Sequence, residues 1–114
     1  MTTQATVDRL FIITVMGEQA EDLTERLTRD QFQITEIGSA GGLLQQSQVS
    51  YLVGFNQQRQ AQLLRNIREC CKRQRRFIPI NMEGPASLLH ATGIEAEVGG
   101  AEVFALNVER YEQV

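Results

Sequence analysis

Two helical segments, each preceded by strand-forming residues, constrain most strongly what this chain can fold into. Residues Leu10–Val15 form an apolar run rich in β-branched side chains, which is typical of a buried strand. Residues 18–29 follow with helical spacing, because Ala20 lies three positions before Leu23 and Leu23 lies four before Leu27. Acidic residues crowd the first turn, where they stabilise the positive end of a helix. The chain is therefore predicted to begin with a strand followed directly by a helix.

A pair of strands and a second helix are predicted next. Residues 32–37 alternate apolar and polar side chains, as in a half-buried strand. We expect Gly38–Gly42 to break this strand, and residues 49–55 to pair with it after a long connection that contains Gln45–Gln48. Residues 58–73 have the spacing of an amphipathic helix. Its apolar stripe consists of Leu63, Leu64, Ile67, Cys70 and Cys71.

The last third of the chain has a weaker pattern. A residue before proline avoids helical conformations, and paired glycines in a strand mark a bend or bulge. We expect an extended segment at 77–80, a loop at 81–93 with a helical turn at 86–90, and two strands at 95–98 and 102–108 around a bend at Gly99–Gly100.

The order of these elements predicts an α+β, ferredoxin-like domain. A β-α-β-β-α-β order with an extra C-terminal strand places two helices on one face of an antiparallel sheet. The opposite face then needs a cover, which a symmetric oligomer can supply. With 114 residues, the chain is expected to form one domain over 1–114, with a flexible N-terminus at 1–8.

The charge of the chain is small and unevenly distributed. The formal net charge is −3, which does not favour binding to nucleic acid. A basic cluster nevertheless lies between Arg65 and Arg76, where Glu69 is the one acidic residue. The cluster is either a solvated helix end that suits the helix dipole or a docking surface for an unidentified protein partner. Its members are Arg65, Arg68, Lys72, Arg73, Arg75 and Arg76.

The sequence shows no sign of a membrane span or a secretory signal. No apolar run approaches the roughly 20 residues that cross a bilayer, and the N-terminal residues lack the basic start and apolar core of a signal peptide. We therefore expect a cytoplasmic protein. Adjacent Cys70 and Cys71 cannot join distant parts of the chain, so we interpret them as structural thiols. His90 has no metal-ligand spacing with these cysteines.

No catalytic motif is present, so we expect neither enzymatic activity nor a cofactor. The sequence contains no nucleophile elbow, phosphate-binding loop or paired-cysteine site. Two features nevertheless allow a ligand-binding interpretation. Gly41–Gly42 is either a tight turn or a segment that lets a ligand approach the main chain. Thr35 is either a strand former or a hydroxyl that contacts a base or a phosphate.

Two stretches carry motifs specific enough to suggest a family. Residues 32–54 contain Thr35, the string Gly41-Gly42-Leu43-Leu44, and Gly54. Residues 95–114 contain the string Glu97-Val98-Gly99-Gly100-Ala101-Glu102-Val103-Phe104. With these motifs the chain resembles the cyclic-di-AMP receptor family of PII-like signalling proteins. The resemblance implies a PII-like fold, a homotrimer, and a ligand site at each subunit interface. It also implies a sensor of cyclic di-AMP that changes loop order and performs no catalysis.

The same resemblance selects the candidate ligand-binding residues. They are Gln33, Thr35, Gly41, Gly42, Leu43, Leu44, Gln48, Gly54 and Gln113. Gln33 stands where the family pattern has an arginine, and Leu43 stands where it has an aromatic ring that can stack on adenine. An arginine contact to phosphate contributes roughly 1.5–3 kcal/mol, and a stacked ring about 1–3 kcal/mol per base. Glutamine can instead read a base edge, because its amide both donates and accepts hydrogen bonds.

The sequence therefore leaves three interpretations of function. The first is a trimeric sensor of cyclic di-AMP or another adenine nucleotide. The second is a related trimer that has diverged to sense another metabolite or an anion. The third is a protein-binding module that uses the basic cluster.

Overall fold

The computed structural model describes residues 6–42, 45–79 and 93–114. The elements follow one another as β1 (Arg9–Met16), α1 (Gly17–Arg29), β2 (Ile34–Gly42), β3 (Gln45–Phe55), a 3-10 turn η1 (Gln57–Arg59), α2 (Gln60–Cys70), β4 (Gln74–Pro79), β5 (Gly93–Val98) and β6 (Ala101–Asn107). This order confirms the predicted α+β class.

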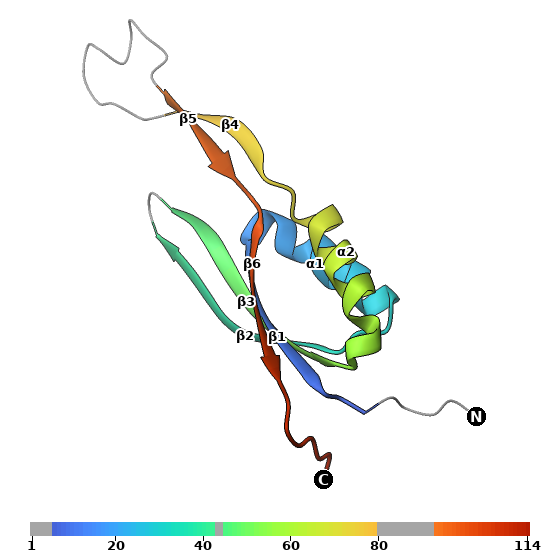
Figure 1. Cartoon of the computed structure of the whole chain (residues 1–114). Coiled ribbons are helices and arrows are strands. Elements are labelled where there is room, and N and C mark those ends of the chain that lie inside the picture. The colour runs from blue at the N-terminus through green and yellow to red at the C-terminus, as the bar shows by residue number, and fades with distance from the viewer. Residues whose placement is uncertain (1–5, 43–44, 80–92) are drawn as a thin grey trace, which may run out of the picture.

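Four strands form an antiparallel sheet in the order β2-β3-β1-β6, and both helices lie on one of its faces (Figure 1). This is the ferredoxin-like arrangement that the sequence predicted. The last strand, β6, pairs along β1 from Ala101 to Asn107 and forms one edge of the sheet. The strands β4 and β5 are additional to this sheet and pair with each other in a separate two-stranded ribbon between α2 and β6.

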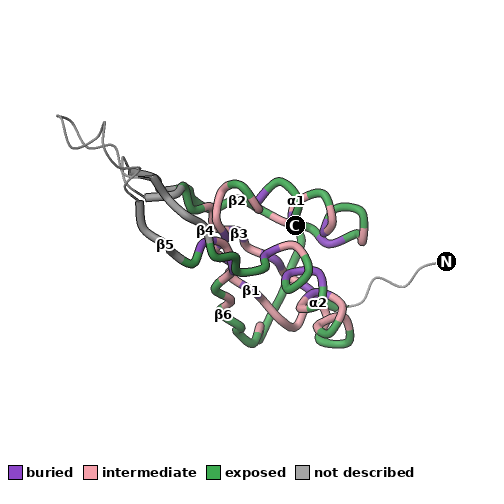
Figure 2. Tube along the Cα trace, turned by 90° about the horizontal axis from the view of Figure 1, so that it is seen from above, coloured by how far each residue is buried: buried purple, intermediate pink, exposed green. Residues whose placement is uncertain are grey.

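The core lies between the helices and one face of the sheet. Phe11, Ile13 and Val15 alternate along β1 and are at most 1% exposed. They belong to one buried cluster with Leu23 and Leu27 of α1, Leu63 of α2 and residues of β3. Figure 2 shows buried residues on both helices and on the strands of the sheet. Each such side chain contributes about 1.5–3 kcal/mol to the stability of the fold by leaving water. Because the buried face of each helix must be apolar for this reason, the apolar stripes in the sequence predicted both helices.

The predicted break in the second strand was wrong. β2 continues to Gly42, and β3 begins at Gln45, so Gln45–Gln48 lie in a strand rather than in a long connection. The register shifts between Glu36 and Gly38, and again between Ala40 and Gly42. Such irregularities bend and twist a strand without ending it, and glycine accommodates them well. The glycines that suggested a break therefore mark irregularities in a continuous hairpin.

The second helix is shorter than predicted. Asn56 caps η1 by accepting a hydrogen bond from the backbone of Gln58, and α2 then runs to Cys70 instead of residue 73. Cys71 has φ −122° and ψ 49°, outside the helical region. Its backbone nitrogen still donates to the carbonyl of Ile67 at 2.9 Å, which closes the last turn. The chain then leads directly into β4.

The β4–β5 ribbon extends beyond the end of the sheet and the helices (Figure 1). Its register runs from Gln74 opposite Val98 to Pro79 opposite Gly93. Residues 77–79 of the predicted extended segment and the predicted strand at 95–98 fall in it. The predicted loop at 81–93, with its helical turn at 86–90, lies outside the described residues except for Gly93, which begins β5. Gly99 and Gly100, which connect the ribbon to β6, have φ values of 84° and 85°.

Candidate functional site

The face of the sheet opposite the helices carries an apolar surface. Along β1 the residues that alternate with the core point to this face, and the strand register places Thr35, Leu52, Ile12 and Phe104 in one row across it. Phe104 is 58% exposed and its neighbour on β6, Leu106, is 42% exposed. Exposed apolar side chains of this size, gathered on one face, are typical of a surface that contacts another molecule.

One end of this face is hollowed into a cavity of about 310 Å³, which we call the sheet pocket. Its wall consists of Val7, Leu10, Gln33, Thr35, Leu52, Gly54, Val108 and Tyr111. The volume is at the small end of the range for cavities that bind small molecules. The pocket is therefore large enough to be considered as a ligand site or as part of one.

The two terminal segments form part of this wall because backbone hydrogen bonds hold them against the sheet. Asp8 donates from its backbone nitrogen to the carbonyl of Phe55 at 3.1 Å, and Val108 donates to the carbonyl of Asp8 at 3.0 Å. The C-terminal segment therefore leaves β6 beside the pocket, where Tyr111 lines it. Gly54 keeps the wall open, since a Cβ atom there would meet a methyl carbon of Val7 at 3.1 Å.

The structure brings three of the candidate residues together. Gln33, Thr35 and Gly54 all line the sheet pocket, on the adjacent strands β2 and β3 and the segment before β2. The pocket wall also includes residues that the sequence reasoning did not select. Tyr111 is the important one, because it adds an aromatic ring beside the polar groups. Tyr111 lies two positions before Gln113, in the stretch that resembles the family. This proximity is the signal by which the sequence could have selected it.

Other candidate residues lie elsewhere in the protomer. Gln48 pairs with Met16 and Ala40 at the far end of the hairpin, close to Gly41 and Gly42. Gln48 and Gly54 are six positions apart on β3, or about 20 Å at roughly 3.3 Å per residue. Gln113 is exposed in the C-terminal segment and does not line the sheet pocket. Leu43 and Leu44 lie outside the described residues.

Gln48 instead lines a second, smaller hollow of about 180 Å³. We call it the joint pocket, because its wall includes the connection between the ribbon and β6. Met16, Gly99, Gly100 and Arg73 are among its other lining residues. Within one protomer the described candidate residues therefore do not form a single site.

The polar groups of the sheet pocket are neutral. Gln33 supplies an amide, Thr35 a hydroxyl and Tyr111 a phenol, and no charged side chain is among the described residues that line it. Amide and hydroxyl groups can read the edge of a nucleobase, and a tyrosine ring can stack on its face. The wall offers hydrogen bonding and stacking rather than charge neutralisation.

The cysteines have the properties of structural thiols. Cys71 is buried, and this burial raises its pKa to about 12. Burial also raises the pKa of Cys70, although the guanidinium of Arg26 opposes the shift. Within the described ranges there is no group of three or more His, Cys, Asp or Glu side chains that could hold a metal ion. None of the described helices is both long and apolar enough to cross a membrane.

A comparison with known families matches residues 9–114 to the cyclic-di-AMP receptor family. The chain belongs to this family. The match covers every described element from β1 to the C-terminal segment that carries Tyr111. The assignment made from the two sequence motifs is thereby confirmed.

Two solved structures of similar shape support the fold, and a third is less similar. A functionally unknown protein from Pediococcus pentosaceus is 24% identical, with a TM-score of 0.71 over 96% of this chain and all of that one. A DUF3240 family protein from Shewanella baltica is 10% identical, with a TM-score of 0.56 over 96% of this chain and 99% of that one. A nitrogen regulatory PII-like protein from Thiomonas intermedia, bound to ADP, AMP and bicarbonate, is 14% identical, with a TM-score of 0.44 over 94% and 98% of the two chains.

Proposed function

We propose that this chain is a non-enzymatic, PII-like signalling receptor that binds cyclic di-AMP or another adenine nucleotide as a cytoplasmic homotrimer. Membership of the cyclic-di-AMP receptor family supports the class of ligand. The observation that carries the proposal is the sheet pocket, whose wall includes Gln33, Thr35 and Gly54 together with Tyr111. In this proposal the ring stacks on an adenine while the amide and the hydroxyl bind its edge.

The trimer is supported by the uncovered face of the sheet. Phe104 and Leu106 expose apolar surface that a second protomer would bury, at a gain of about 25 cal/mol for each Å². A neighbouring protomer can also bring its hairpin end, with Gly41, Gly42 and Gln48, to the sheet pocket. Residues about 20 Å apart in one protomer would then belong to one interfacial site. Ligand binding at such an interface would reorganise the nearby loops and so relay the signal.

A binding panel on the purified protein tests this proposal. Thermal-shift and calorimetry measurements with cyclic di-AMP, cyclic di-GMP, ATP, ADP and AMP are run beside a mass measurement in solution. We expect a trimeric mass and a saturable response to at least one adenine nucleotide. A folded trimer without response to any nucleotide would rule out the nucleotide ligand, and a folded monomer would rule out the interfacial site.

Matched variants test the pocket itself. Replacing Tyr111 with leucine removes the stacking ring and should weaken nucleotide binding by roughly 5- to 150-fold, which corresponds to about 1–3 kcal/mol. Thr35→Val removes one hydroxyl from the pocket, and Thr28→Val removes an exposed hydroxyl at the end of α1 as its control. Equal affinities of the two threonine variants would show that the ligand binds elsewhere.

A second candidate function is a receptor that has diverged toward another metabolite or an anion. The neutral wall of the sheet pocket favours it, because the phosphates of cyclic di-AMP gain no cationic partner from the described lining residues. The double variant Gln33→Arg with Leu43→Phe restores the family pattern. It should create or strengthen cyclic-di-AMP binding if these two positions account for the divergence. An unchanged response would show that the pocket differs in more than these side chains.

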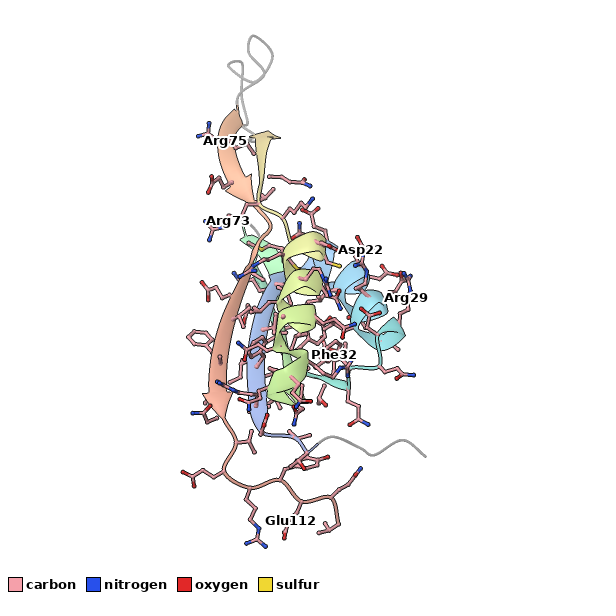
Figure 3. The ribbon with its side chains drawn as sticks, turned by 45° about the vertical axis from the view of Figure 1, so that its right-hand side comes forward. Asp22, Arg29, Phe32, Arg73, Arg75 and Glu112 are labelled. Carbon is pink, nitrogen blue, oxygen red and sulfur yellow. The ribbon has the colours of Figure 1, made fainter. Side chains whose placement is uncertain are left out.

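The basic cluster supports a third candidate, docking of an acidic protein. Arg65, Arg68, Lys72, Arg73 and Arg75 are all exposed. Figure 3 shows Arg73 and Arg75 along the start of the ribbon, on the side away from α1. Reversing the charge of Arg73 and Arg75 to glutamate should abolish capture of an acidic protein partner in a pull-down. An interaction profile that does not change would exclude this surface as the docking site.

A further inference from the structure

The β4–β5 ribbon joins the rest of the protein through two short segments. Residues 71–73 lead from α2 into β4, and Gly99–Gly100 lead from β5 into β6. Neither helix nor the four-stranded sheet packs along the described length of the ribbon (Figure 1). A two-stranded ribbon with so little support is expected to move as a unit about its base unless the base is held.

The side chain of Gln19, on the first turns of α1, bonds to both segments at this base. Its amide nitrogen donates to the backbone carbonyl of Lys72 at 2.8 Å. Its amide oxygen accepts from the backbone nitrogen of Gly100 at 3.1 Å. One planar side chain therefore connects the segment that enters the ribbon, the segment that leaves it, and a helix of the body.

The packing around this amide holds the base closely. Cys71 in the first segment and Val98 just before the second are each 5% exposed, and a Cβ atom on Gly99 would lie 2.7 Å from the backbone oxygen of Lys72. The ion pair of Arg73 with Glu97, at 4.0 Å between mostly exposed side chains, adds little to this arrangement. The hydrogen bonds of Gln19 are therefore directional contacts that join both segments of the base to α1.

We propose that Gln19 is a clamp that sets the angle of the β4–β5 ribbon relative to the body, and that the ribbon swings about Gly99–Gly100 when the clamp opens. The clamp does not depend on the proposed function. The effect of the clamp on signalling does depend on the proposed function. The connection is the joint pocket, whose wall includes Gly99, Gly100 and Gln48. A change in the angle of the ribbon would alter the surroundings of Gln48, one of the candidate ligand-binding residues. The clamp would thus link the ribbon to the receptor site.

Residual dipolar couplings of backbone amides test the clamp without any ligand. In the wild type, one alignment tensor should fit the amides of the four-stranded sheet and those of the ribbon together. Gln19→Leu removes both hydrogen bonds at nearly constant volume. We expect the ribbon of this variant to need a separate tensor of smaller magnitude, and the amide of Gly100 to exchange with solvent roughly 2- to 10-fold faster.

Two further variants complete the test. Gln58→Leu makes the same change at an exposed position outside the ribbon, and it should behave like the wild type. Gln19→Glu keeps the acceptor for Gly100 but cannot donate to Lys72, so it should give an intermediate result. A single tensor in Gln19→Leu with an unchanged exchange rate would overturn the proposal. So would a wild-type ribbon that already needs its own smaller tensor, since it would not be held. Both outcomes are independent of whether a nucleotide binds.

Discussion

Replacing Gly99 with alanine should destabilise the protein far more than the same change at Gly38. Gly99 has φ 84°, a conformation that residues with a Cβ atom rarely adopt. A Cβ atom there would lie 2.7 Å from the backbone oxygen of Lys72, and 2.8 and 2.9 Å from the two polar atoms of the Gln19 amide. A Cβ atom at Gly38 would meet nothing within 4 Å.

The expected cost follows from these contacts. The left-handed conformation costs a residue with a Cβ atom about 1–2 kcal/mol. The contact with the backbone oxygen cannot relax without moving the chain, and the Gln19 amide must leave its position. Its two hydrogen bonds each contribute about 0.5–1.5 kcal/mol, so the whole change should cost about 2–5 kcal/mol. Since small domains are stable by about 5–15 kcal/mol, this is a large fraction of the total.

The assay is chemical denaturation followed by far-ultraviolet circular dichroism, because the chain contains no tryptophan to report unfolding. All variants are compared at one protein concentration, since association changes the apparent stability. Gly38→Ala should stay within about 0.5 kcal/mol of the wild type, as surface changes usually do. If Gly99→Ala matched Gly38→Ala, the reasoning from the positive φ and the close contacts would be refuted.

Three other predictions concern stability. Asn66→Ala should cost about 1.5–3 kcal/mol in denaturation, because the buried Asn66 amide donates to the carboxylate of Asp30 at 2.7 Å. Glu69→Gln should cost less than about 1 kcal/mol, because its ion pair with Arg26 joins partly exposed side chains. Stability should fall between pH 9 and 12, because the Cys71 pKa is raised from 9.0 to about 12 on folding. Only the unfolded chain loses this proton there, with a slope of about 1.4 kcal/mol per pH unit that Cys71→Ala should remove.

Each of these three predictions has an outcome that contradicts it. An Asn66→Ala variant as stable as the wild type would mean that the Asp30 carboxylate finds other partners. A loss above about 2 kcal/mol for Glu69→Gln would show that the ion pair is better shielded than its exposure indicates. Identical pH profiles of the wild type and Cys71→Ala between pH 9 and 12 would show that the thiol titrates normally in the folded protein.

The sequence was informative about the fold where apolar side chains repeat with a regular period. Phe11, Ile13 and Val15 alternate along β1, and Leu23 and Leu27 repeat along α1, so the period alone assigned both elements. The prediction from sequence failed at Gly38–Gly42, where glycines suggested a break but the chain continues as an irregular strand. Pairing with β3 decides that outcome, and a local pattern contains no information about pairing between strands.

The candidate site shows the same division. By itself the sequence determined the family and the order of the elements, and it selected Gln33 and Thr35 as candidate ligand contacts. Only the tertiary structure placed Tyr111 in one pocket wall with Gln33, Thr35 and Gly54, and Gly54 lies about 20 Å along β3 from Gln48. It also placed Gln19 between Lys72 and Gly100. The physical reason is that these contacts join residues far apart in the chain, and their positions depend on how the sheet and the helices pack together.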